Sequence, residues 1–441
     1  MTPPAGATNK IVHIKRQWHL KENPFPSEAI ARLGGEDLRE NGLLFNPSVQ
    51  ADKVEEAAEK FVLGAAYSGL KFGFLWSLGT GMHGDARGFG KSSLMQYLVE
   101  NINHDFGRSI FLDTGLDESD ADEHPMCSVI ASFDMANARS LNAVFFSAAQ
   151  YACRFRTDDD TPTLAERIYA RLVERVGSSE PEALMGAVDA AQQQLRGRTL
   201  GPPVQDFLTL LCSGDFPALA AYIENDVSVT KRTRSGASFL ATFLIMVKAA
   251  GINHVLLCCD QLEDFASTNT TKAKRSLEIE RFRDYLLELQ PMSDMLSVVV
   301  TMHPRATQAI GEMWQLADLP SYDYAREENR HRVVVLESLH TVEKAAALLE
   351  NYLARFRSDT ATETGLYPFT EDAVDAILVR SDGKPREILR KANALIEAGG
   401  EENWDVIDGE RAAGLLDSFA ADDEDEFLSP TSGRTVAGDL Y

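Results

Sequence analysis

A glycine-rich turn between an apolar segment and a helical segment constrains the fold of this chain most strongly. The turn covers residues 84–93 and has the sequence G-D-A-R-G-F-G-K-S-S. It follows the apolar run Phe72–Leu78 and precedes Leu94–Asn103, whose pattern predicts a helix. Glycines let such a turn curl until its backbone N–H groups point at one place, which makes a cradle for phosphate oxygens. The segment therefore predicts a strand, a phosphate-binding loop and a helix, in that order.

Two side chains at the end of the turn have the chemistry that a phosphate site needs. Lys91 would reach the β- and γ-phosphates of a nucleotide, and the Ser92 hydroxyl would bind the accompanying Mg²⁺. The loop pattern is incomplete, because Asp85 stands where the first glycine is expected and Gly84 comes one place early. A carboxylate at the mouth of the loop would repel ATP unless it points outward. The turn predicts bound ATP and Mg²⁺, while Asp85 keeps open a non-hydrolysing scaffold as an alternative.

A second segment has the features of a metal site. The apolar run Val255–Cys259 is followed at once by Asp260, and then by Glu263 and Asp264. A buried strand that ends in a carboxylate suits Mg²⁺, and a glutamate shortly after it can orient or deprotonate the attacking water. Asp260 is therefore the predicted metal residue, with Glu263 the first choice for the water and Asp264 the second. An aspartate at a strand end is otherwise typical of a helix cap, so the upstream phosphate loop is what favours the metal role.

Composition indicates a globular protein of a reducing compartment. The chain has 441 residues, of which 44% are hydrophobic and 25% charged, and no apolar run approaches the roughly 20 residues of a membrane span. The N-terminus has no hydrophobic signal core. The five cysteines are odd in number and lack metal-ligand spacing. We therefore expect a cytoplasmic protein with no disulfides, no zinc and no contact with a membrane.

The formal net charge of −24 is concentrated towards the C-terminus. Residues 401–441 contain 12 acidic and 2 basic side chains, which predicts a solvated, disordered tail or an acidic docking peptide. A balance this negative argues against broad binding to a polyanion. A local basic strip such as Lys231, Arg232 and Arg234 still allows nucleic-acid binding.

Apolar segments alternate with helical ones through the middle of the chain, which is typical of a parallel sheet covered on both faces. One of the expected strands is Ser109–Leu112. We expect an α/β chain with the three-layer fold of P-loop NTPases, a helical insertion and a C-terminal helical lid. The expected parts are an N-terminal arm and helix at 1–70, a core at 71–338 with its insertion at about 141–250, the lid at 339–400, and the acidic tail at 401–441.

Four motifs together resemble the AAA+ superfamily of P-loop ATPases, particularly the branch of replication initiators and of transposition and secretion ATPases. The first is Asn-Pro-Phe at Asn23–Phe25, and the second is R-G-F-G-K-S-S-L at Arg87–Leu94, similar to a Walker A motif. The third is Val255–Phe265, similar to a Walker B motif, and the fourth is Gly-Lys-Pro-Arg at Gly383–Arg386, similar to a sensor 2 motif. The resemblance extends over roughly residues 20–400, and only the two Walker motifs are specific.

The resemblance implies roles for residues at other positions. Thr301 or His303 would occupy the sensor 1 position, where a polar side chain reports on the γ-phosphate. Arg386 would contact the γ-phosphate from the lid as sensor 2. Arg326 or Arg330 would be an arginine finger that acts on a neighbouring subunit. The nucleotide would be held by Arg87, Gly88, Phe89, Gly90, Lys91, Ser92 and Ser93, and the metal by Ser92 and Asp260.

The resemblance further implies a Mg²⁺-dependent ATPase that couples its nucleotide state to a partner protein or nucleic acid. Such proteins rarely act alone, so we expect a homo-oligomer or a separate effector protein, in transposition, replication or anti-phage defence. The sequence D-Q-L-E that starts at Asp260 is also similar to STAND signalling ATPases. A nucleotide-held STAND-type sensor is therefore the second interpretation, and the non-hydrolysing scaffold is the third.

Overall fold

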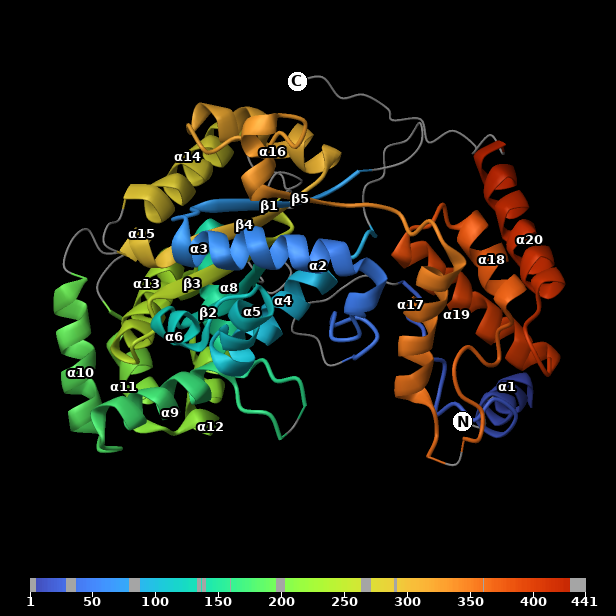
Figure 1. Cartoon of the computed structure of the whole chain (residues 1–441), viewed down its shortest axis with the longest axis horizontal. Helices are drawn as coiled ribbons and strands as arrows, with labels where there is room; N and C mark the ends of the chain where they lie inside the picture. The colour runs from blue at the N-terminus through green and yellow to red at the C-terminus, as the bar shows by residue number, and fades with distance from the viewer. Residues whose placement is uncertain are drawn as a thin grey trace, which may run out of the picture. The chain divides into compact units, whose positions relative to one another are not determined.

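The chain forms two compact units in this computed structural model (Figure 1). Ile30–Glu337 make one, called here the core unit, and Met1–Ala29 together with Ser338–Tyr441 make the other, called the terminal unit. The structure describes residues 5–28, 37–78, 88–132, 136, 140–158, 160–195, 203–262, 271–288, 292–359 and 361–428.

The core unit is built on a five-stranded parallel sheet with the order β2-β3-β4-β1-β5. Nearly every residue of these strands is buried, because their sequences are continuous apolar runs rather than alternating ones. The expected α/β class with a parallel sheet is therefore confirmed. The strands are β1 (Phe72–Ser77), β2 (Met126–Ser132), β3 (His254–Asp260), β4 (Leu296–Met302) and β5 (Val333–Leu336).

Helices cover the sheet on both faces (Figure 1). On one face, Phe72 of β1 packs edge-on against Phe282 and Trp314, which belong to α14 and α16. On the other face, α4 contacts β1 and β2, and α2 contacts β5. These covering helices are α2 (Ala51–Ala57), the π-helix η2 (Ala58–Leu63), α3 (Gly64–Tyr67), α4 (Lys91–Asp105), α5 (Arg108–Asp113), α14 (Lys272–Arg283) and α16 (Pro304–Leu316). Short elements connect them: η1 (Pro47–Gln50), α6 (Glu118–Glu123), η5 (Asp284–Glu288), α15 (Met292–Met295) and η6 (Glu327–Arg332).

A helical region lies between β2 and β3, as expected. Its first helix, α8, packs against the last, α13, at a point where Gly236 has no side chain to keep the helices apart. A Cβ atom at Gly236 would lie 1.6 Å from the carbonyl oxygen of Asn142. The helices are α8 (Leu141–Arg154), α9 (Leu164–Val176), α10 (Pro181–Gln194), α11 (Gln205–Ser213), α12 (Phe216–Ala221), η3 (Tyr222–Asp226) and α13 (Val229–Ala249).

The expected strand at Ser109–Leu112 is wrong, because this segment belongs to helix α5. Its apolar residues Ile110 and Phe111 are buried, but they follow the end of α4 after a two-residue turn at Phe106 and Gly107. Both turn residues have left-handed backbone angles, with φ of 59° and 87°. The apolar cluster is therefore buried as one side of a short helix, a pattern that a four-residue run does not distinguish from a strand.

The terminal unit is helical, and the segments that form it differ from the expected domains. The segment at 1–70 does not form one arm, since its first part belongs to the terminal unit and the rest to the core unit. The acidic region after residue 400 contains the end of α19 and the whole of α20, which ends at Leu428. The helices are α1 (Ala5–Arg16), α17 (Val342–Phe356), α18 (Glu371–Arg380), α19 (Pro385–Glu402) and α20 (Gly409–Leu428).

Helix α20 is held by both apolar and ionic contacts, which is why the start of the acidic region folds. Ala412 and Leu416 are buried. Arg380 of α18 binds Asp417 with two parallel contacts of 2.7 and 2.9 Å, and this guanidinium lowers the pKa of the Asp417 carboxyl. Residues 429–441 of the expected tail lie outside the described residues.

The Asn-Pro-Phe motif joins the N-terminal segment to α19 within the terminal unit. The Asn23 side chain donates to Glu397 Oε1 at 2.7 Å, and the Asn393 side chain donates to the Phe25 carbonyl at 2.6 Å. The Phe25 ring is buried beside Tyr352 and Phe369. The motif therefore has a structural role here. None of the helices in the described residues combines the length and the apolar character needed to cross a membrane.

Candidate functional site

The described part of the glycine-rich loop leads directly into the N-terminus of α4. Gly88 and Gly90 have φ angles of 86° and 88°, a left-handed conformation that suits glycine. Gly90 is the N-cap residue of α4 and has no side chain with which to cap the first N–H groups of the helix. A Cβ atom placed on Gly90 would meet no atom of the described residues within 4 Å. A helix N-terminus without a side-chain cap suits an anion such as phosphate.

Lys91 turns back from the start of α4 towards the end of β1. Its ammonium group lies 2.6 Å from the hydroxyl of Ser77, the last residue of that strand. The lysine is 9% exposed and Ser77 is fully buried. Because a lysine is rarely buried to this degree, the burial of Lys91 at the loop indicates that its positive charge has a functional role.

Ser92, Asp260 and Thr301 are linked by hydrogen bonds although they come from three separate parts of the sequence. Ser92 donates its hydroxyl proton to Asp260 Oδ2 at 2.6 Å, and Thr301 donates to Asp260 Oδ1 at 2.8 Å. The sheet explains the meeting, since β4 lies between β3 and β1 and pairs Cys259 with Val300. Asp260 and Thr301 thus lie at the carboxyl ends of neighbouring parallel strands. The predicted metal residue and the predicted sensor 1 residue are in direct contact.

The donor set around Asp260 matches the needs of Mg²⁺ bound with a nucleotide. Among the described residues, no group of three or more His, Cys, Asp or Glu side chains is arranged to hold a metal ion. Magnesium does not require such a cage, because it is usually bound by one or two carboxylates, water and the phosphates of the substrate. A carboxylate and a hydroxyl 2.6 Å apart beside an anion-binding loop therefore fit Mg²⁺ with a nucleotide better than they fit a permanent metal centre.

Three supporting residues were missed by sequence reasoning. One is Ser77, the partner of Lys91. The other two are Gln261 and Ser132: Gln261 has a φ of 59° and donates its N–H to Thr301 Oγ1 at 3.2 Å, and its side-chain oxygen accepts from Ser132 at 3.2 Å. The available signal was a polar residue at the end of each apolar run. Ser77, Ser132 and Asp260 each close a buried strand at the same edge of the sheet.

The remaining residues of the loop and of the segment after β3 are only partly described. Phe89 is buried, with 1% of its surface exposed, and Ser93 is half-buried on the first turn of α4. Four residues named in the sequence analysis lie outside the described residues. They are the predicted nucleotide contact Arg87, Asp85, which stands in place of the expected glycine, and the two residues predicted to activate water. These last two are Glu263 and Asp264.

His303 is placed close to the site but has a structural task. It is buried at the start of α16 and its Nδ1 accepts the Ala306 N–H at 3.4 Å, which caps the helix. Thr301, two residues earlier, is the one that contacts Asp260. Of the two sensor 1 choices, the geometry therefore favours Thr301.

The predicted arginines are in different surroundings. Arg326 is exposed and paired with Asp323 at 3.1 Å and with Glu328 at 3.3 Å, and Arg330 is exposed at 4.0 Å from Glu327. Neither reaches into the cluster around Asp260 in the single chain. Arg386 is the second residue of α19 in the terminal unit. The finger and sensor 2 roles remain predictions.

Comparison with solved structures gives a distant likeness. No family model and no curated protein matches the chain. Among solved structures, the chain is similar to the ORC2 protein of Aeropyrum pernix in ADPNP–ADP complexes. The identity is 12%, the match covers 90% of this chain and 71% of that one, and the TM-score is 0.40.

Proposed function

We propose that this chain is a Mg²⁺-dependent ATPase of the AAA+ type that acts as a nucleotide-controlled switch. The observation that supports it best is a hydrogen bond of 2.6 Å between Ser92 and Asp260. Ser92 lies on the helix after the phosphate loop, and Asp260 lies at the end of β3. Residues 168 positions apart supply the two ligands that the metal of a bound nucleotide needs. The buried Lys91 adds the positive charge that phosphate requires.

Each residue of the cluster has a definable task in this proposal. Lys91 exchanges Ser77 for the terminal phosphates and offsets their charge. Ser92 and Asp260 would hold Mg²⁺, which would offset the negative charge of the phosphates. Thr301 fixes the orientation of the Asp260 carboxylate, and Glu263 orients or deprotonates the attacking water.

We further propose that the switch acts in a cytoplasmic assembly, either as a homo-oligomer or with a separate effector protein. All five cysteines are free and buried, which supports a reducing compartment. Exposed arginines such as Arg326 and Arg330 support a role towards a neighbouring subunit. Nucleic acid is the less favoured partner because of the net charge of −24.

Hydrolysis measured on the wild type and two variants tests the proposal. Lys91→Ala is expected to lower the rate about 100-fold or more, since it removes a charge that stabilises the transferred phosphoryl group. Glu263→Gln is expected to abolish hydrolysis while nucleotide binding survives. Lys60→Ala is the matched control, because this lysine belongs to the same unit but binds Glu56 and the Val333 carbonyl.

Two outcomes would favour the other interpretations. Tight binding of nucleotide without turnover in the wild type would identify a non-hydrolysing scaffold. A mass that does not change with a slowly hydrolysed ATP analogue would favour a monomeric STAND-type sensor, and the finger role of Arg326 or Arg330 would be withdrawn.

A further inference from the structure

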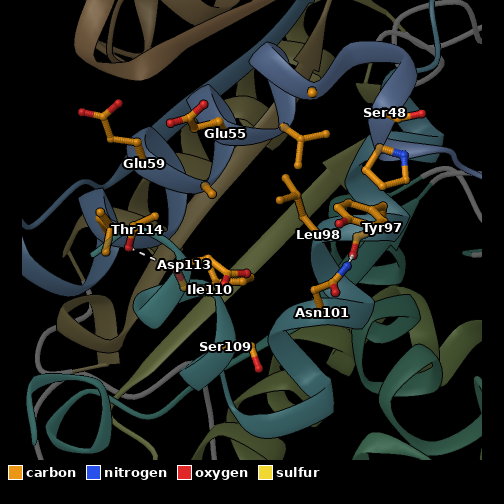
Figure 2. A pocket seen from close by; sticks show the side chains of 15 residues that line it. Ser48, Glu55, Glu59, Tyr97, Leu98, Asn101, Ser109, Ile110, Asp113 and Thr114 are labelled. Atoms are coloured by element: carbon orange, nitrogen blue, oxygen red, sulfur yellow. Dashed lines mark hydrogen bonds between the residues drawn. The ribbon is translucent and has the colours of Figure 1, made fainter. Parts of the chain in front are cut away.

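A hollow of the core unit lies between the helices that cover one face of the sheet (Figure 2). Its volume is about 530 Å³. Side chains from α2 and η2 line one wall, and side chains from α4 and α5 line the other. We call it the α2–α5 groove. Lys91, Ser92, Asp260 and Thr301 are not among its lining residues, so it is separate from the candidate nucleotide site.

The floor of the groove is apolar. Val54, Ala58 and Leu63 contribute from the first wall, and Leu98 and Ile110 from the second. Val54 and Leu63 are only half-buried, which leaves aliphatic surface open to a ligand. Binding sites of this size with an apolar floor gain affinity by excluding water from such surface.

The charged residues of the groove are all acidic. Glu55 and Glu59 stand one turn apart on the first wall and Asp113 stands on the second, and none of the described residues that line the groove is a lysine, arginine or histidine. All three carboxylates are exposed, and none forms an ion pair with another described residue. Within the part of the chain that the structure describes, the groove thus combines an apolar floor with a negative rim that forms no ion pair.

On the first wall, the acidic residues that line the groove are not the ones that the neighbouring lysines bind. Lys53 and Lys60 both bind Glu56, at 3.0 and 2.6 Å, and Lys60 also donates to the Val333 carbonyl. The lysines nearest to Glu55 and Glu59 are therefore already engaged away from the groove. A cation that neutralises the rim has to come from outside this part of the chain.

The negative charge of Asp113 also affects a tyrosine of the second wall. Burial and the nearby carboxylate of Asp113 raise the pKa of Tyr97 above its ordinary value. The Tyr97 ring also packs against Phe45 at 5.2 Å, and Asn101 one turn later donates to the Tyr97 carbonyl at 2.7 Å. The wall is thus already ordered in the free chain, which lowers the entropic cost of binding.

We propose that the α2–α5 groove is a docking site for a basic, amphipathic segment of a partner protein. Apolar side chains of this segment fill the floor between Val54 and Leu98, and its lysines or arginines meet Glu55, Glu59 and Asp113. This is the arrangement in which an amphipathic helix lies in a groove and opposite charges fix its register. Nucleic acids and anionic lipids have the wrong charge for this rim.

A direct test uses a fluorescent amphipathic peptide of leucine and lysine as the probe, with anisotropy as the readout. Two matched peptides accompany it, one with glutamate in place of lysine and one with serine in place of leucine. The double variant Glu55→Lys/Glu59→Lys is expected to bind the probe about tenfold more weakly than the wild type. Asp113→Asn, on the opposite wall, gives a smaller loss in the same direction.

The control variant is Glu174→Lys/Asp189→Lys, which changes the net charge by the same amount at exposed positions of α9 and α10. It is expected to bind the probe within about twofold of the wild type. Equal losses in both double variants, or equal binding of the serine peptide, would overturn the proposal, since the attraction would then be non-specific charge. Dimers that dissociate in Glu55→Lys/Glu59→Lys, observed by light scattering, would also overturn it by assigning the groove to a second copy of this chain.

Discussion

The cluster around Asp260 and the pair Arg326 and Arg330 represent two kinds of predicted functional residue. Asp260 and Thr301 are 3% and 2% exposed and are joined by hydrogen bonds of the single chain. Arg326 and Arg330 are exposed and pair only with acidic neighbours a few residues away. The first group is joined by contacts within the single chain, whereas the second is predicted to act on a neighbouring subunit.

This difference shows where each role has to be tested. A buried cluster should respond to substitution in the isolated protein, both in stability and in ligand binding. Exposed arginines with local partners should have no measurable role until another surface is present, because surface ion pairs stabilise little. The following experiments would break or sharpen this contrast.

The largest effect is expected from removing the hydroxyl that links α4 to Asp260. Ser92→Ala should weaken Mg²⁺-dependent nucleotide binding about 10- to 100-fold, because one ligand of the metal is lost. Ser213→Ala removes a serine hydroxyl at the end of α11, where it donates to the Leu210 carbonyl, and should have a much smaller effect. Titration with Mg²⁺ at fixed nucleotide measures both. Equal losses in the two variants would contradict the metal role of Ser92.

A smaller effect is expected at the centre of the cluster. Thr301→Val keeps the shape of the side chain but leaves both the Gln261 N–H and Asp260 Oδ1 without this partner. The free energy of unfolding should fall by about 1–2 kcal/mol, measured by urea denaturation. Thr307→Val is the control, since that hydroxyl only bonds to the Pro304 carbonyl within α16. Unchanged stability in Thr301→Val would mean that the cluster is not preorganised.

The smallest effect on the isolated chain is expected at the arginines. Arg326→Ala and Arg330→Ala should each change the free energy of unfolding by less than about 0.5 kcal/mol. Their hydrolysis rate should fall only at protein concentrations where the chain assembles. A loss of activity that is independent of protein concentration would move these residues into the first group.

Much of the core could be predicted because its determinants are local in the sequence. The apolar runs that became β1 and β3 lie where the patterns placed them, and the carboxyl ends of parallel strands must share one edge of the sheet. This rule places Asp260 and the phosphate loop at the same edge of the sheet. The bond between Thr301 and Asp260 also needs the strand order, which no local pattern contains.

Other features depended on distant contacts and could not be predicted. Ser109–Leu112 has the composition of a strand, but it follows the left-handed turn at Phe106 and Gly107 and lies in helix α5, which packs against α4, α6 and η2. The N-terminal segment joins the terminal unit through Asn23 and Phe25, whose partners lie more than 300 residues away. The start of the acidic region folds because Arg380 binds one of its carboxylates and because α20 buries a small apolar side.

The most direct test of the central claim is calorimetric titration with ATP, with and without Mg²⁺, on the wild type and Asp260→Asn. Asparagine retains an oxygen that accepts from Ser92 or Thr301, so the fold should persist while the charge that holds the metal is lost. We predict that Mg²⁺ strengthens ATP binding to the wild type and has little effect on binding to Asp260→Asn. Absence of binding to the wild type, or equal strengthening by Mg²⁺ in both proteins, would contradict a shared phosphate and metal site at Lys91, Ser92 and Asp260.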